Sequence, residues 1–123
     1  MTIRPALFAP LLLAPFLLAT GAAWGHAHVK TSAPADKSTL AAAPTRLAIT
    51  FNEPALVTVL TLQQDGATPA PLGPLPKEPA RDLALPLPAL AAGHYTVKWR
   101  ALGDDGHVTS GALQFTVAGS KSP

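Results

Sequence analysis

Three segments of this 123-residue chain alternate apolar and polar side chains with a period of two, at residues 46–51, 94–100 and 112–117. Successive side chains of a β-strand point to opposite faces, so the pattern predicts strands with one buried and one solvated face. The side chains expected to face the core are Leu47, Ile49, Phe51, Tyr95, Val97, Trp99, Leu113, Phe115 and Val117. No segment shows a convincing helical period, which predicts an all-β fold.

Three more segments are candidate strands. Residues 56–62 are apolar on both faces, which predicts a strand that is more deeply buried, and residues 29–33 and 82–85 are weaker candidates. Seven prolines between Pro69 and Pro88 remove backbone donors, so we expect a long, partly extended loop with one edge strand there. Short strands at this spacing in about 100 residues predict an antiparallel Greek-key β-sandwich or barrel.

The first 25 residues have the three parts of a secretory signal: a positive charge at Arg4, an apolar stretch at residues 7–19, and small residues before the cut. A small-x-small pattern ending at Gly25 places cleavage before His26, although cuts two residues to either side are also chemically possible. An uncleaved anchor is the alternative, but the stretch is shorter than the roughly 20 residues that span a bilayer. We therefore predict a signal peptide at 1–25, one domain at 26–123 and a periplasmic location.

Charge and cysteine content exclude several classes of protein. The nine Lys and Arg residues nearly balance the seven Asp and Glu residues, and no basic run could grip phosphates, so nucleic acid is not expected as a partner. The chain has no cysteine, which in an exported protein removes disulfides and thiolate ligands. The mature chain is long enough for one small domain with a single core.

Two short motifs near opposite ends of the mature chain carry metal-binding groups: His26-Ala27-His28 and Asp105-Gly106-His107. After cleavage, His26 would offer a metal its α-amine and its Nδ1 atom. One more imidazole and one carboxylate would complete a site of three nitrogens and one oxygen, and nitrogen-rich sites of this kind suit Cu(II). Asp105 and His107 share a face if their segment is extended. The sequence does not show that His26 reaches them.

Other interpretations of the histidines remain open. Asp-Gly is common in hairpins, so Asp105 and His107 also fit a solvated loop. A free amine with a histidine in third place can wrap Cu(II) with two deprotonated backbone amides and that imidazole, and His28 stands in third place. Ala27 has the amide that this chelate needs. His94 lies on the solvated face of its strand and is interpreted as a surface residue.

The chain resembles the CopC family of periplasmic copper-resistance proteins. The segments that carry the resemblance are His26-Ala27-His28-Val29, Ser32-Ala33-Pro34-Ala35, Ala43-Pro44, Ile49-Thr50-Phe51-Asn52-Glu53, Gly93 to Arg100, and Asp105-Gly106-His107 through Gly111. They cover nearly the whole mature chain, and residues 63–88 match least. The resemblance implies a cupredoxin-like or immunoglobulin-like β-sandwich that binds Cu(II) through His26, Asp105 and His107. It also places Glu53 near the copper, as a neighbour or a weak extra ligand.

Some members of that family also hold Cu(I) in a methionine-rich loop. The only methionine of this chain is Met1, and soft sulfur ligands are the ones that favour Cu(I). We therefore expect one Cu(II) ion per chain and no second Cu(I) site.

The leading functional hypothesis is a monomeric binding protein, and not an enzyme. It would buffer periplasmic copper or pass it to an inner-membrane transporter of the CopD type. One alternative is an immunoglobulin-like interaction module with incidental histidines. Another is a copper oxygenase that uses a histidine pair with a free amine, although Asp105 would crowd the position that oxygen needs. Copper affinity is expected to fall on acidification, because the amine and both imidazoles must be deprotonated to bind.

Overall fold

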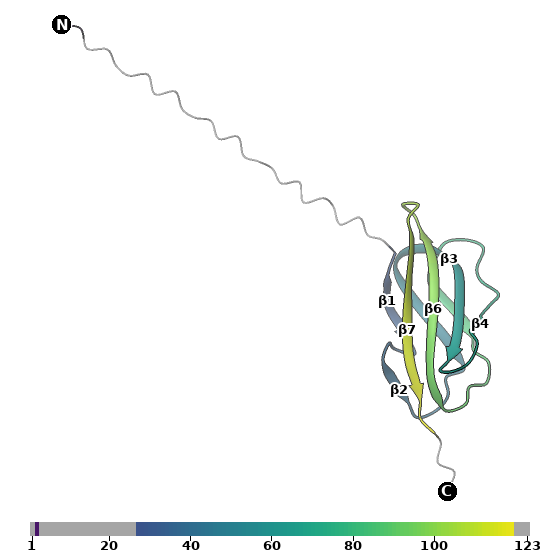
Figure 1. The fold of residues 1–123 in the computed structure, drawn as a ribbon. Coiled ribbons are helices and arrows are strands. Elements are labelled where there is room, and N and C mark those ends of the chain that lie inside the picture. The colour runs from purple at the N-terminus through teal and green to yellow at the C-terminus, as the bar shows by residue number, and fades with distance from the viewer. Residues whose placement is uncertain (1, 3–26, 120–123) are drawn as a thin grey trace.

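The computed structural model describes residue 2 and residues 27–119 of the chain. Apart from residue 2, the predicted signal peptide lies outside the described residues, and so does His26. The described part has seven strands and no helix that could cross a membrane (Figure 1). The strands are β1 (Val29–Ala33), β2 (Ser38–Leu40), β3 (Arg46–Gln64), β4 (Ala70–Pro71), β5 (Ala80–Pro86), β6 (Gly93–Gly103) and β7 (Val108–Val117).

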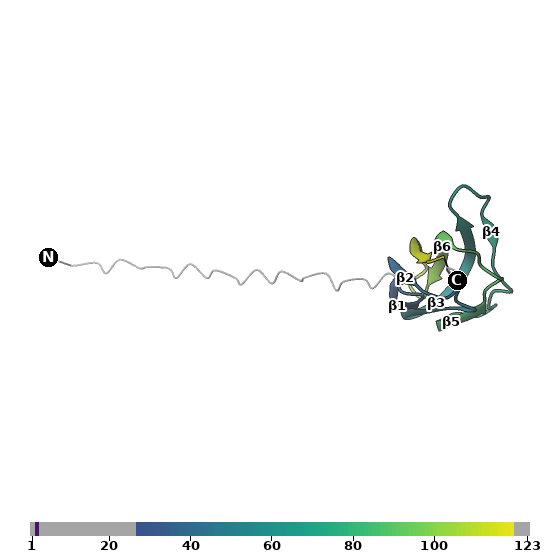
Figure 2. The ribbon, with the colours of Figure 1, turned by 90° about the horizontal axis from the view of Figure 1, so that it is seen from below.

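The long strand β3 joins two layers of the fold. Its first half pairs with β1 and β5, and its second half pairs with β6 and β4. Ala55 marks the change, because it pairs with Ala80 of β5 and also with Gly103 of β6. Figure 2 shows β1 and β5 along one side of the molecule and β6 along the other. One strand therefore serves both layers of the predicted sandwich.

The strand order is β1-β3-β6-β7-β2, with β4 and β5 also paired to β3. All pairs are antiparallel except β2 with β7, which run parallel, so the predicted antiparallel β fold is confirmed with one parallel pair at this edge. The physical reason is that β1 and β2 lie at opposite edges of the sheet. The chain between them crosses over instead of turning back as a hairpin, and so β2 arrives at β7 in the parallel direction.

The core is formed by the side chains that alternation predicted. Leu47, Ile49 and Phe51 are almost completely buried, and the inward residues of β6 and β7 join them. Phe51 packs edge-to-face against Trp99, with ring centroids 5.3 Å apart. Tyr95 stacks on Phe115 at the same centroid distance, and its hydroxyl donates to the Ala91 carbonyl at 2.6 Å. These contacts tie β3, β6 and β7 into one core.

The second half of β3 differs from its prediction. Residues 56–62 are not buried on both faces, since Val59 is 44% exposed and Leu56 is half-buried. A register shift between Val57 and Val59 inserts one residue relative to β6. Such a bulge resets the period of two, so Val57 and Leu60 both face the core although they are three residues apart. The extra apolar residues lie on the outer face.

The proline-rich region behaves as predicted. β4 is two residues long, and β5 pairs with β3 alone, which makes it an edge strand. Most of the remaining residues between Pro71 and Ala80 have no strand partner. The candidate strands at 29–33 and 82–85 are confirmed as β1 and as part of β5.

Candidate metal centre

The hairpin between β6 and β7 carries Asp105 and His107. The Gly103 N–H donates to the His107 carbonyl at 2.9 Å, and the Gly106 N–H donates to the Gly103 carbonyl at 3.0 Å. Gly106 has a φ of 80°, a left-handed conformation that glycine adopts without steric cost. The hairpin is therefore a tight turn followed by a left-handed glycine. Asp105 and His107 meet because the chain turns here, as the Asp-Gly pair indicated, and not because the segment is extended.

Both carboxylate oxygens of Asp105 contact His107. Oδ1 accepts the His107 backbone N–H at 3.0 Å, and Oδ2 lies 2.9 Å from Nδ1 of the imidazole. A carboxylate beside one ring nitrogen fixes the ring's orientation, and metal-binding histidines in proteins commonly have such a partner. The ring nitrogen that faces away from Asp105 is Nε2. The Asp105 side chain is 18% exposed and that of His107 is 61% exposed. The imidazole therefore lies at the surface, beside a largely buried carboxylate.

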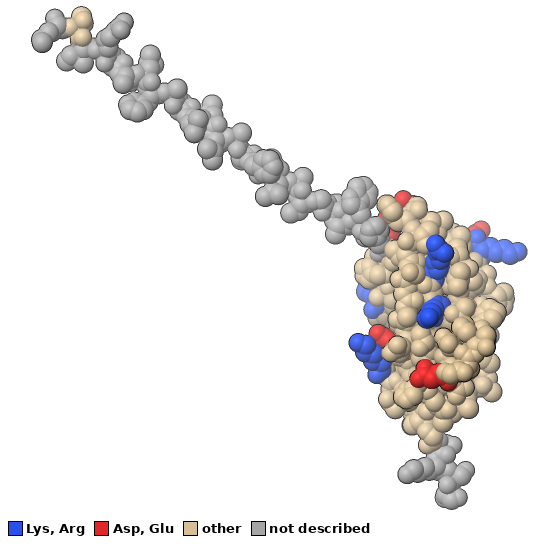
Figure 3. Space-filling view, viewed as in Figure 1, with Lys and Arg blue, Asp and Glu red and all other residues tan. Residues whose placement is uncertain are grey.

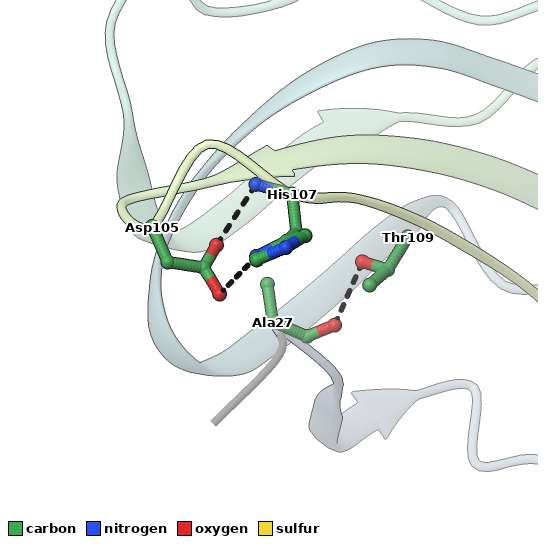
Figure 4. A network of polar contacts seen from close by, with 4 residues as sticks. All are labelled: Ala27, Asp105, His107 and Thr109. Carbon is green, nitrogen blue, oxygen red and sulfur yellow. Dashed lines mark hydrogen bonds and ion pairs between the residues drawn. The ribbon is translucent and has the colours of Figure 1, made fainter. Parts of the chain in front are cut away.

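The beginning of the domain lies at the same end as this hairpin (Figure 1). The Ala27 carbonyl accepts a hydrogen bond from Thr109 Oγ1 of β7 at 2.8 Å. The His28 N–H donates to Asn52 Oδ1 of β3 at 2.7 Å, and the Asn52 N–H donates back to the His28 carbonyl at 3.0 Å. Figure 4 shows Ala27 between Thr109 and the Asp105–His107 pair. The sequence alone could not establish this meeting of the two chain segments.

Glu53 brings a second carboxylate to this end of the molecule. A Cβ atom on Gly103 would lie 3.0 Å from Asp105 Oδ1, 3.1 Å from Glu53 Oε1 and 3.6 Å from the Ala27 Cβ. Two carboxylates and the Ala27 methyl therefore converge on one point. Glu53 Oε1 is buried and accepts no hydrogen bond from the described residues. A buried carboxylate oxygen without a donor is costly, and a nearby cation would compensate it.

The described residues contain only part of the candidate metal centre. Within residues 27–119, no three His, Asp or Glu side chains are arranged to hold an ion by themselves. The structure brings Asp105 and His107 together and places Glu53 and Ala27 beside them, whereas His26 lies outside the described residues. The chemistry still fits a cation. The oriented His107 imidazole, the largely buried Asp105 carboxylate and the buried Glu53 Oε1 lie at one end of the domain.

The other histidines lie differently. His94 is near the start of β6, at the opposite end from the hairpin, and its Nδ1 lies 2.7 Å from Thr116 Oγ1. His28 follows Ala27, just before β1, and bonds to Asn52 through its backbone. On the face that Figure 3 shows, charged side chains are spread over a largely uncharged surface and do not gather into one patch.

Comparisons with known proteins agree with this fold. The family model of the CopC domain matches residues 29–118. Protein YobA of Escherichia coli strain K12 is 30% identical over 105 residues, which are 81% of this chain and 85% of that protein. The chain therefore belongs to the CopC domain family, as its motifs indicated.

Solved structures lead to the same family. The crystal structure of CopC from Methylosinus trichosporium OB3b superposes with a TM-score of 0.66 at 27% identity, covering 80% of this chain and 99% of that one. The crystal structure of PcoC, a methionine-rich copper resistance protein from Escherichia coli, gives a TM-score of 0.56 at 29% identity, covering 75% and 98%. This chain is not methionine-rich, since Met1 is its only methionine.

Proposed function

We propose that this protein is exported to the periplasm, loses residues 1–25 and binds one Cu(II) ion per chain. The observation that carries the proposal is the Asp105–His107 pair, which is oriented by its own hydrogen bonds and lies beside the first residues of the domain. One peptide bond separates residue 26 from Ala27, so their Cα atoms are about 3.8 Å apart. A new amine at His26 therefore starts close to the pair.

The ligands would be the amine and imidazole of His26, the His107 imidazole through Nε2, and the Asp105 carboxylate. A carboxylate has about four acceptor positions, so the two bonds from Asp105 to His107 are compatible with a bond to a metal. Glu53 would contribute negative charge beside the ion. Three nitrogens and one oxygen form a set that favours Cu(II), and the absence of Cys and of Met beyond Met1 disfavours Cu(I).

The function that follows is copper buffering, or delivery of copper to an inner-membrane transporter of the CopD type, by a monomeric carrier that performs no catalysis. The family supports this proposal, because PcoC is a copper resistance protein by name. Reduction to Cu(I) would release the metal, since nitrogen and oxygen donors hold Cu(I) poorly compared with thioethers or thiolates.

The test is a competition titration with Cu(II) on purified protein whose first residue is shown by mass spectrometry to be His26. His107→Gln should lower the affinity by more than the roughly 10- to 100-fold that loss of an outer partner costs. His94→Gln is the matched control, since His94 lies at the other end of β6, and it should bind like the wild type. A chain with one glycine added before His26 should also bind weakly, because its amine is displaced. Equal affinity in all four proteins would refute the proposal.

A further inference from the structure

The peptide unit between Ala27 and His28 is held at both ends by two different strands. Its carbonyl oxygen accepts a hydrogen bond from the Thr109 hydroxyl of β7, and its N–H donates a hydrogen bond to Asn52 Oδ1 of β3. The next carbonyl, that of His28, accepts the Asn52 N–H. The Ala27 side chain is 2% exposed. This short arm, residues 27 and 28, precedes β1, and its 27–28 peptide is hydrogen-bonded at both its N–H and its carbonyl, as in a paired strand.

The clamped unit contains a nitrogen that a competing copper complex would need. In a chain beginning at His26, the amino-terminal chelate would use the amine, the amide nitrogens of Ala27 and His28, and the His28 imidazole. Each amide would give its proton to the buffer when it binds the metal. Proline in the second position would block this complex covalently, but Ala27 does not. Whatever prevents the chelate in this chain must therefore be noncovalent.

The hydrogen bonds supply such a barrier. The His28 amide nitrogen faces Asn52 Oδ1 at 2.7 Å, so it could turn to a metal only if the whole peptide unit rotated. Because the unit is planar, that rotation also moves the Ala27 carbonyl away from Thr109. Both bonds would be lost together, and the buried Ala27 methyl would leave its place beside Gly103.

We propose that Asn52 and Thr109 are positioning residues that select how this chain binds copper. By clamping the 27–28 peptide they exclude the amino-terminal chelate and direct the metal to Asp105 and His107. This inference rests on the proposed function. Neither residue is a proposed copper ligand, and each acts through its hydrogen bond to the 27–28 peptide. Loss of one hydrogen bond should raise the chelated fraction relative to the folded site by about fivefold.

The experiment compares the Cu(II) electron paramagnetic resonance and visible spectra of the chain beginning at His26 with those of Asn52→Ala, Thr109→Val and the double variant. The wild type should give a spectrum of three nitrogens and one oxygen that changes when His107→Gln is added. The double variant should shift toward a four-nitrogen spectrum that survives His107→Gln and is lost with His28→Gln. The single variant Thr109→Ser keeps the hydroxyl and, unlike Thr109→Val, should give the wild-type spectrum.

A matched control is Thr50→Val, which removes a 2.8 Å hydrogen bond to Asp82 from the same strand as Asn52 without touching the arm. It should leave the copper spectrum unchanged. Hydrogen exchange in the metal-free protein adds a readout that needs no copper and no variant. The His28 amide should exchange slowly in the wild type, and circular dichroism should confirm that each variant is folded.

The outcomes separate this inference from the function on which it rests. A wild type that binds no Cu(II) would overturn both. Copper held through His107 in the wild type, with unchanged spectra and unchanged His107 dependence in the double variant, would overturn the clamp and leave the function standing. A wild type that already shows the His28-dependent four-nitrogen spectrum, or a His28 amide that exchanges like an exposed one, would also refute the clamp.

Discussion

Gly103→Ala should separate the stability of the fold from the geometry of the site. Gly103 is the last residue of β6, and its φ lies outside the left-handed region, so alanine fits the backbone. The new Cβ would lie 3.0 Å from Asp105 Oδ1 and 3.1 Å from Glu53 Oε1. No other single methyl group reaches both carboxylates among the described glycine positions.

The size of the displacement decides which property suffers. Carbon and oxygen atoms in weak contact are about 3.3 to 3.6 Å apart. Asp105 Oδ1 must therefore retreat by roughly 0.3 Å or more, and Glu53 Oε1 by roughly 0.2 Å or more. Partly exposed carboxylates can make that shift, and we expect the free energy of unfolding to fall by about 1 kcal/mol or less. Metal distances tolerate only about 0.2 Å, and Asp105 would carry the His107 imidazole with it. Copper affinity should therefore fall on the order of 10-fold or more.

The assay is a Cu(II) competition titration beside a urea unfolding curve. Gly119→Ala is the matched control, because its Cβ would meet only the Ala92 Cβ at an ordinary 3.8 Å. It should change neither the affinity nor the stability by a measurable amount. A Gly103→Ala protein that binds copper as tightly as the wild type would refute the inferred convergence of Asp105 on the metal. One that loses several kcal/mol would show that the carboxylates cannot yield.

Three further results are expected. Gly111→Ala should lower the free energy of unfolding in urea by about 1 to 3 kcal/mol, because the new Cβ would lie 2.7 Å from the Trp99 ring and the ring must then move. An unchanged midpoint of the urea unfolding curve would contradict this. Tyr95→Phe should cost about 1 kcal/mol by the same measurement, since it removes the 2.6 Å bond to the Ala91 carbonyl. Copper affinity should fall steeply from about pH 7.5 to about pH 5, because protons compete for the nitrogen ligands, and a flat profile in a competition titration would exclude those ligands.

The sequence predicted local structure well where one face of a strand is buried. Alternation identified the inward residues of β6 and β7 because the pleat imposes it residue by residue. The prediction that residues 56–62 are buried on both faces was wrong at Val59, since a bulge depends on how β3 pairs with β6 and not on β3 alone. The parallel pairing of β2 with β7 was missed for the same reason, because strand direction at a sheet edge is set by the path of the whole chain.

The candidate site shows a similar division. The Asp105–His107 pair was predictable from its spacing, although the structure forms it through a turn. Asn52 lies within one of the segments that carry the family resemblance, but the sequence did not indicate a function for it. The sequence did not indicate a function for Thr109 either. Their bonds to His28 and Ala27 span 24 and 82 residues of sequence. Contacts at that separation follow from the fold, and a local pattern cannot encode them.

The way in which the site is assembled has an energetic consequence. Asp105 orients His107 within one hairpin, and the arm is fixed at Ala27 and His28, so both halves are ordered before a metal arrives. Preorganisation of this kind raises affinity by lowering the entropy lost on binding. Under the proposed function, the hydrogen bonds of Asn52 and Thr109 would therefore strengthen Cu(II) binding by holding the residues before β1 in place.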